Sequence, residues 1–204
     1  MTINVISLGS ECDVSYQIAK NFQYLGIRIT HFFDWLISDM DSVINLLSNE
    51  IGNILIPSNI KQIGSKGNNV ILIFRNCSKL ISMHDVPLKY SSNDIFDFIC
   101  KYKRRYFRFM QLIRSNKKTY FIRRDNASDE NINKLLDVFN KINKTNNIFL
   151  IFLRTDIINH EIYNKRVIFL NFNKFKLNDN DDWQRNNYAW NLIFDFILEI
   201  SKDN

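Results

Sequence analysis

The chain has 204 residues, enough to bury a substantial core without disulfides or metal ions. Hydrophobic residues make up 46% and charged residues 24%, which excludes a disordered chain, and five Gly with two Pro exclude collagen-like and linker-rich sequences. The net charge is +6, no apolar run approaches the roughly 20 residues of a membrane helix, and the first residues do not form a signal peptide. We therefore expect a soluble, cytoplasmic protein without membrane contact.

The first half of the chain alternates between strand and helix patterns. An apolar run at residues 4–8 ends at Gly9 and precedes a helical pattern, which predicts a strand, a tight turn and a helix. Ser38 and Asp41 have capping-box spacing ahead of a second helical stripe that runs to Ile51. Residues 57–69 are expected to form a loop, and residues 70–74 and 80–83 the two strands of a hairpin.

The second half continues the alternation. Ser91 and Asp94 cap a long helix over 94–115, a strand follows at 120–122, and Ser128 caps a helix over 129–143. Residues 148–153 and 167–170 are continuous apolar runs, typical of strands buried on both faces, before a closing helix over 189–200. The pattern predicts an α/β fold: a three-layer sandwich with a mainly parallel central sheet, helices on both faces and one antiparallel hairpin. No linker divides it, so we expect one domain over 1–204.

The positive charge is concentrated in one segment. Residues 101–124 contain ten Lys or Arg and no acid, so this segment carries +10 and the rest of the chain 17 minus 21, or −4. On a helix, Lys101, Arg104, Arg105 and Arg108 share one face. We interpret this as the solvated face of an amphipathic helix, with an anion site or a nucleic-acid stripe as alternatives. Nucleic acid is disfavoured because no zinc-finger, RNP-like or helix-turn-helix pattern is present.

The cysteines single out one candidate nucleophile. Three cysteines without a C-x-x-C pair argue against a disulfide framework and a zinc site, and we expect neither a metal nor another cofactor. Cys12 falls in the first turn of the first helix, where the helix dipole favours a thiolate and backbone N–H groups around Ser10 to Cys12 could bind an oxyanion. Gly9 permits the tight turn and a close approach of substrate. A small, packed Cys12 without a catalytic role is an equal alternative.

A nucleophilic cysteine needs a base, and His84 is the best placed of the three histidines because it ends a predicted strand. Asp85, if the strand has already broken into a loop, or Asp34 could orient its ring. Arg123 and Arg124 follow a buried strand and could bind a carboxylate or phosphate, although exposed arginines at strand ends are common.

Several blocks together resemble one known family. The blocks, in chain order, are ISLGSECDVSYQI, HFFDWLIS, SMHDV, YKRRYFRFMQLI, KKTYFIRR and DDWQRNNYAW. This combination resembles the family of bacteria and large DNA viruses described as putative papain-like cysteine peptidases. The resemblance implies a Cys12 nucleophile, a His84 base, a peptide, protein or acylated substrate, and as an alternative fold the α+β arrangement of papain-like enzymes.

Two other functions are compatible with the sequence. The Gly-Ser block after the first strand is similar to the start of SGNH-type acyl hydrolases, with Ser10 as the nucleophile, but residues 178–185 lack the histidine that this family places near its C-terminus. The second alternative is a non-enzymatic α/β binding or interaction protein with a basic face, in which Cys12 is incidental.

Overall fold

The computed structural model of the chain describes residues 3–22, 29–49, 51–77, 79–145, 147–172 and 187–202. The main sheet, sheet A, has five strands in the order β1-β6-β7-β9-β8. These strands are β1 (Asn4–Ser7), β6 (Thr119–Arg124), β7 (Ile148–Arg154), β8 (Glu161–Asn164) and β9 (Val167–Asn171). Pairing is parallel from β1 to β9, and β8 joins the edge in the antiparallel sense.

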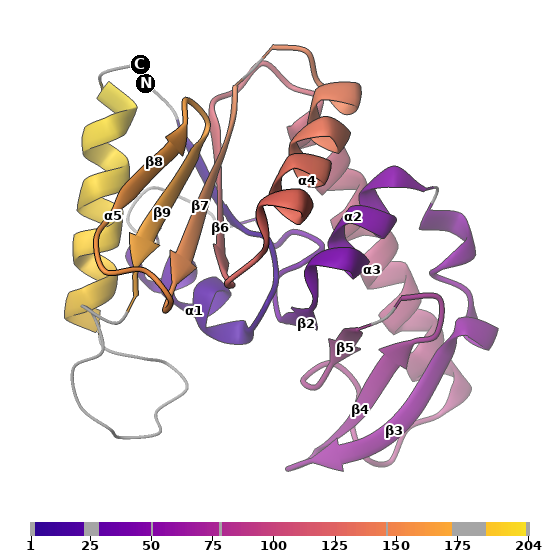
Figure 1. Ribbon diagram of the computed structural model, residues 1–204. Helices are drawn as coiled ribbons and strands as arrows, with labels where there is room; N and C mark the ends of the chain where they lie inside the picture. Colours follow the sequence, from indigo (N-terminus) through magenta and orange to yellow (C-terminus); the bar gives the residue numbers. More distant parts are fainter. Residues whose placement is uncertain are drawn as a thin grey trace.

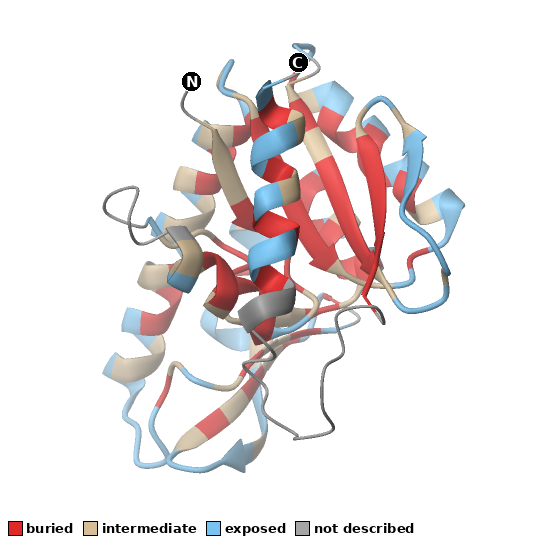
Figure 2. Cartoon of the chain, turned by 90° about the vertical axis from the view of Figure 1, so that its left-hand side faces the viewer, coloured by how far each residue is buried: buried red, intermediate tan, exposed pale blue. Residues whose placement is uncertain are grey.

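Helices cover both faces of sheet A, as Figure 1 shows. On one face, α1 (Cys12–Phe22) and α5 (Asn187–Lys202) contribute Val14, Ile18, Trp190 and Ile193 to a cluster with the strands. The other face packs against α4 (Asp129–Ile142), which Ser128 caps as predicted. Figure 2 shows the buried strands behind α5, whose outer side is exposed. The predicted layered α/β fold is thus confirmed, because strands buried on both faces need helices above and below.

A second sheet, sheet B, is larger than the predicted hairpin. It is antiparallel, with the order β2-β5-β4-β3, and its strands are β2 (Leu36–Ser38), β3 (Ile60–Lys66), β4 (Asn69–Phe74) and β5 (Leu80–Ser82). The hairpin of β4 and β5 was predicted, whereas the loop predicted over 57–69 is wrong. β3 is an edge strand with mostly exposed side chains and a bulge between Gln62 and Gly64, so it lacks the apolar alternation that marks a strand.

Two further helices contribute side chains to the core that the two sheets share. The helix predicted after Ser38 is α2 (Met40–Ser48), and its cap is Asp39, whose carboxylate accepts from the N–H of Ser42; Ser38 ends β2 instead. Two short 3-10 turns follow at Ile51–Asn53 and Pro57–Asn59. The basic helix is α3 (Ser92–Ile113), with the predicted capping box at Ser91 and Asp94. Side chains of both sheets and of α2, α3 and α4 form one continuous hydrophobic core.

Candidate active site

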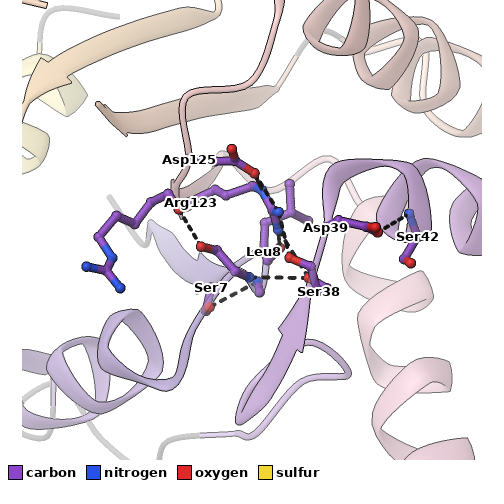
Figure 3. Close-up of polar contacts among 10 residues, drawn as sticks. Ser7, Leu8, Ser38, Asp39, Ser42, Arg123 and Asp125 are labelled. Atoms are coloured by element: carbon purple, nitrogen blue, oxygen red, sulfur yellow. Dashed lines mark hydrogen bonds and ion pairs between the residues drawn. The ribbon is translucent and has the colours of Figure 1, made fainter. Parts of the chain in front are cut away.

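The turn after β1 brings two chain segments into contact. Gly9 and Ser10 both have left-handed backbone angles, with φ of 78° and 82°. The N–H of Gly9 donates to the hydroxyl of Ser7 at 3.2 Å, and the N–H of Ser10 donates to the hydroxyl of Ser38 at 3.2 Å (Figure 3). The Ser10 hydroxyl donates to the backbone carbonyl of Arg124. Ser10 is therefore a structural residue of the turn, which gives no support to the SGNH-type reading in which it is the nucleophile.

Gly9 is required by space as well as by conformation. A Cβ at this position would overlap the hydroxyl oxygen of Ser38 and lie 3.5 Å from a guanidinium nitrogen of Arg123. The tight approach lets the end of β1 contact the end of β2, so a strand of each sheet meets at this turn. The predicted role of Gly9 in the turn agrees with this geometry.

Arg123 is a buried clamp between the sheets rather than an exposed anion ligand. Its side chain is 1% exposed, and all five of its N–H groups donate to protein atoms. Two donate to the carbonyls of Leu8 (2.9 Å) and Ser38 (2.8 Å), one to the Ser38 hydroxyl (3.1 Å) and two to the carboxylate of Asp125 (2.9 and 2.7 Å). Burial lowers the pKa of Arg123, and Asp125 opposes that effect. The expectation that Arg123 binds a ligand is thus not met.

Arg124 is also engaged by protein groups. It pairs with Glu11 and, at 3.2 Å, with the buried Asp13, and its guanidinium lies 5.7 Å from the ring centre of Phe172. These two acids flank Cys12 in the sequence, so Arg124 ties the end of β6 to the start of α1. The expected carboxylate or phosphate ligand of Arg124 is replaced by the protein's own carboxylates.

Cys12 is the first residue of α1 and is 8% exposed. Its Sγ lies 3.8 Å from the backbone carbonyl oxygen of Trp35, in a geometry in which the thiol donates. Burial raises the pKa of Cys12 to about 11, and the negative charges of Asp13, Glu11 and Asp85 act in the same direction. The helix N-terminus was expected to favour the thiolate. Desolvation and the neighbouring carboxylates act against that expectation, because both disfavour the charged thiolate.

Trp35 connects Cys12 to His84. Its backbone φ is 68°, a conformation that bulky residues rarely adopt, and the N–H of Leu36 donates to the Phe33 carbonyl across this turn. While the Trp35 carbonyl faces the Cys12 thiol, its indole meets the imidazole of His84 edge to face, with 6.5 Å between ring centres. His84 is exposed and lies in the bend that follows β5. Three segments distant in sequence thus converge on a strained residue, as is common at functional sites.

Asp85 lies in the bend that follows β5, and within the described part of the chain none of its hydrogen bonds goes to the His84 ring. Its carboxylate accepts from the Ser82 hydroxyl at 2.5 Å, from the Lys101 ammonium at 2.6 Å and from the Tyr102 hydroxyl at 2.6 Å. Burial works to raise the pKa of Asp85, but the hydrogen bond and charge of Lys101 lower it below its ordinary value. Asp85 therefore anchors the bend that contains His84 to α3.

Asp34 is buried and holds the turn that precedes Trp35. It accepts from the Ser15 hydroxyl and from the backbone N–H of His31, both at 2.9 Å. Among the described residues, no hydrogen bond joins Asp34 or Asp85 to the ring of His84. His31 itself packs beside Phe109. The predicted role of either aspartate as a direct partner of the imidazole is therefore absent from this arrangement.

Sequence patterns did not identify two residues of the site. Trp35 belongs to an apolar stretch that resembles core, and its left-handed backbone leaves no trace in the sequence. Ser38 stands at capping-box spacing, yet its hydroxyl serves Ser10 and Arg123 across the sheet junction. In both cases the function of the side chain depends on partners far away in the chain.

Comparison with known proteins identifies the family. The family described as "Putative papain-like cysteine peptidase" matches residues 3–163. The chain belongs to this family. It is also 28% identical over 220 residues to an uncharacterised protein of Acanthamoeba polyphaga mimivirus, covering 92% of this chain and 95% of the relative. No solved structure matches the chain significantly. The family description points to a cysteine nucleophile, and the cysteine at the start of α1 lies against the strained residue Trp35, whose indole contacts the ring of His84.

Two further observations describe the wider molecule. Within the described ranges, none of the helices has both the length and the apolar character that crossing a membrane requires. The same residues contain no group of three His, Cys, Asp or Glu side chains arranged to hold a metal ion.

Proposed function

We propose that this member of the putative papain-like cysteine peptidase family is a thiol hydrolase that cleaves peptide-like acyl bonds with Cys12 as nucleophile and His84 as general base. The observation that carries the proposal is the shared contact with Trp35, whose carbonyl lies 3.8 Å from the Cys12 sulfur while its indole packs against the His84 ring. The raised pKa of Cys12 makes the neutral thiol the resting form. A base is therefore needed during the reaction.

The proposed cycle uses the groups of this site. The S–H bond of Cys12 turns from the Trp35 carbonyl toward His84, which takes the proton as sulfur attacks the substrate carbonyl carbon. The oxyanion would be met by the backbone N–H of Cys12, in the first turn of α1, since the N–H of Ser10 is engaged by Ser38. Imidazolium then protonates the leaving amine, and water activated by His84 hydrolyses the thioester, which restores the thiol.

Covalent peptide probes test this assignment directly. A peptidyl acyloxymethyl ketone library should add one adduct to Cys12 of the native protein, identified by mass spectrometry. Cys12→Ser and His84→Ala should each abolish the adduct. Cys77→Ser and His31→Ala are matched controls, because these residues lie outside the Trp35 contact, and both should retain labelling. Adducts spread over all three cysteines, or labelling unchanged by His84→Ala, would refute the catalytic pair.

Turnover provides the second measurement. Peptide thioesters or fluorogenic peptides with the probe's sequence should be hydrolysed by the native protein and by the two control variants. Cys12→Ser and His84→Ala should each abolish this hydrolysis. Hydrolysis that survives Cys12→Ser but is lost in Ser10→Ala would instead establish the SGNH-type alternative. A native protein that binds no probe and hydrolyses none of these substrates would favour the non-enzymatic alternative.

A further inference from the structure

The outer face of α3 carries two aromatic side chains in the solvent. Phe96 and Phe107 are each 63% exposed, whereas the opposite face of the helix supplies Phe98, Tyr102 and Phe109 to the core. Phe96 and Phe107 are eleven residues apart, which is three helical turns, so they lie on one stripe roughly 16 Å apart. Figure 1 shows α3 on the far side of α2 and sheet B. Exposed aromatic side chains in register are typical of a surface that another molecule covers.

Part of the positive charge that the fold leaves unpaired lies on the same face. Lys101, Arg123 and Arg124 pair with carboxylates, and Arg108 donates to the carbonyl of Thr30. Other basic residues of the segment behave differently: Lys103, Arg104 and Arg114 are exposed, and within the described part of the chain no ion pair or hydrogen bond engages their side chains.

This stripe, the outer face of α3, therefore combines two apolar side chains with surrounding basic residues. Its members are Phe96, Cys100, Lys103, Arg104, Phe107 and Arg114. Acidic side chains of the helix lie near its N-terminal end, where Asp94 is part of the cap and Asp97 is exposed. The C-terminal two thirds of the face is thus uniformly positive.

A second copy of the chain does not fit this face. Antiparallel packing that sets Phe96 against the Phe107 of another copy brings Lys103 and Arg104 of both copies together at the centre, and parallel packing aligns all the basic residues. Either arrangement places like charges together, which costs free energy in a contact that excludes water. Single-stranded nucleic acid also fits poorly, since stacking surfaces place aromatic rings beside successive bases.

We propose that the outer face of α3 binds an acidic amphipathic segment of another protein, with two apolar anchors about three helical turns apart and carboxylates opposite residues 103–114. Such a segment fills both requirements of the surface: it covers the exposed Phe96 and Phe107 and neutralises the unpaired charge. The proposal does not depend on catalysis at Cys12.

Peptide selection tests the partner chemistry without assuming a sequence. A display library of random 18-residue peptides would be selected on Cys12→Ser protein, in which hydrolysis cannot interfere, with Phe96→Ser/Phe107→Ser protein as the counter-selection target. The matched control is Ile158→Ser/Ile162→Ser, because these side chains are 80% and 77% exposed in another part of the molecule. Selected peptides would be synthesised with a fluorophore and their binding measured by anisotropy.

The proposal predicts net-negative peptides with apolar residues eleven positions apart. Their affinity should fall at least about tenfold on the double Phe variant and on Lys103→Glu/Arg104→Glu, weaken with salt, and stay unchanged on the Ile variant. Neutral or basic peptides, or none that depend on the two Phe, would overturn it. Binding of poly(U) RNA that depends on the same side chains would also overturn it. The same holds for a dimer, seen by sedimentation in the wild-type protein, that is lost in the Phe96→Ser/Phe107→Ser variant.

Discussion

Gly9→Ala tests the contact that joins the two sheets. At a φ of 78°, an alanine enters the left-handed region, which costs about 1–2 kcal/mol. Its Cβ also overlaps the Ser38 hydroxyl, and relieving an overpacked contact of this kind costs about 1–3 kcal/mol more. The free energy of unfolding should therefore fall by about 2–5 kcal/mol, a large part of the stability of a typical domain.

Two glycines of the same chain separate the two contributions. Gly67 has a left-handed φ of 57°, whereas the φ of Gly52 lies outside the left-handed region. A Cβ would meet nothing within 4 Å at either position. Gly67→Ala should cost about 1–2 kcal/mol and Gly52→Ala about 0.5 kcal/mol or less in either direction. Urea unfolding followed by tryptophan fluorescence gives all three values.

A double-mutant cycle identifies the overlapping atom. Once Ser38→Ala removes the hydroxyl, the nearest atoms to a Cβ at position 9 are the Cβ of residue 38 at 3.4 Å and an Arg123 nitrogen at 3.5 Å. Gly9→Ala combined with Ser38→Ala should therefore be about 1–3 kcal/mol less destabilised than the sum of the single variants. Additive effects, or a Gly9→Ala cost no greater than that of Gly67→Ala, would refute the reasoning.

Three other predictions concern buried ionisable side chains. Arg123→Lys should lower the free energy of unfolding by roughly 2–5 kcal/mol, because an ammonium has three donors where the guanidinium uses five, while Arg114→Lys on the surface should change it by about 0.5 kcal/mol or less. Because the pKa of Asp85 is lowered in the fold, its pairing with Lys101 stabilises the protein above the ordinary carboxyl pKa, and this contribution is lost as pH falls through the folded pKa. Asp85→Asn should therefore be less stable than wild type by about 1–3 kcal/mol at neutral pH. This difference in the free energy of unfolding should narrow in acid, and a difference that stays constant with pH would contradict the prediction. Because the pKa of Cys12 is about 11, its reaction with iodoacetamide at pH 8 should be about 100-fold slower in the native than in the urea-unfolded protein. The reaction rate of the native protein should rise toward pH 11. Native labelling as fast as unfolded labelling would be inconsistent with burial of the thiol.

Local patterns accounted for much of the fold. The apolar runs at β7 and β9 and the caps Ser91 and Ser128 were predictable, because burial on both faces and capping depend on residues close in sequence. β3 was missed since an exposed, bulged edge strand needs no apolar alternation. β2 was missed because three residues are too few for a period to show, and only pairing with β5 makes them a strand.

The candidate site also contains features that local sequence predicts and features that it does not. Its chemistry-bearing residues, Cys12 and His84, could be proposed from their positions at a helix start and a strand end. The protonation state of Cys12 could not be predicted, since the pKa of a thiol depends on burial and on every charge around it, including Asp85 from the bend after β5. The same holds for Arg123, which on sequence grounds was a ligand-binding candidate and in the fold is a saturated clamp.

The sequence by itself determined a strand-helix alternation, a basic segment and one cysteine at the start of a helix, because periodicity, caps and turns are properties of neighbouring residues. Tertiary structure alone decided that Trp35 contacts both Cys12 and His84, that burial raises the pKa of the thiol, and that part of the segment's unpaired charge lies beside Phe96 and Phe107 on α3. These properties arise from contacts between segments tens of residues apart, and burial in those contacts sets both which polar groups are satisfied and which remain available.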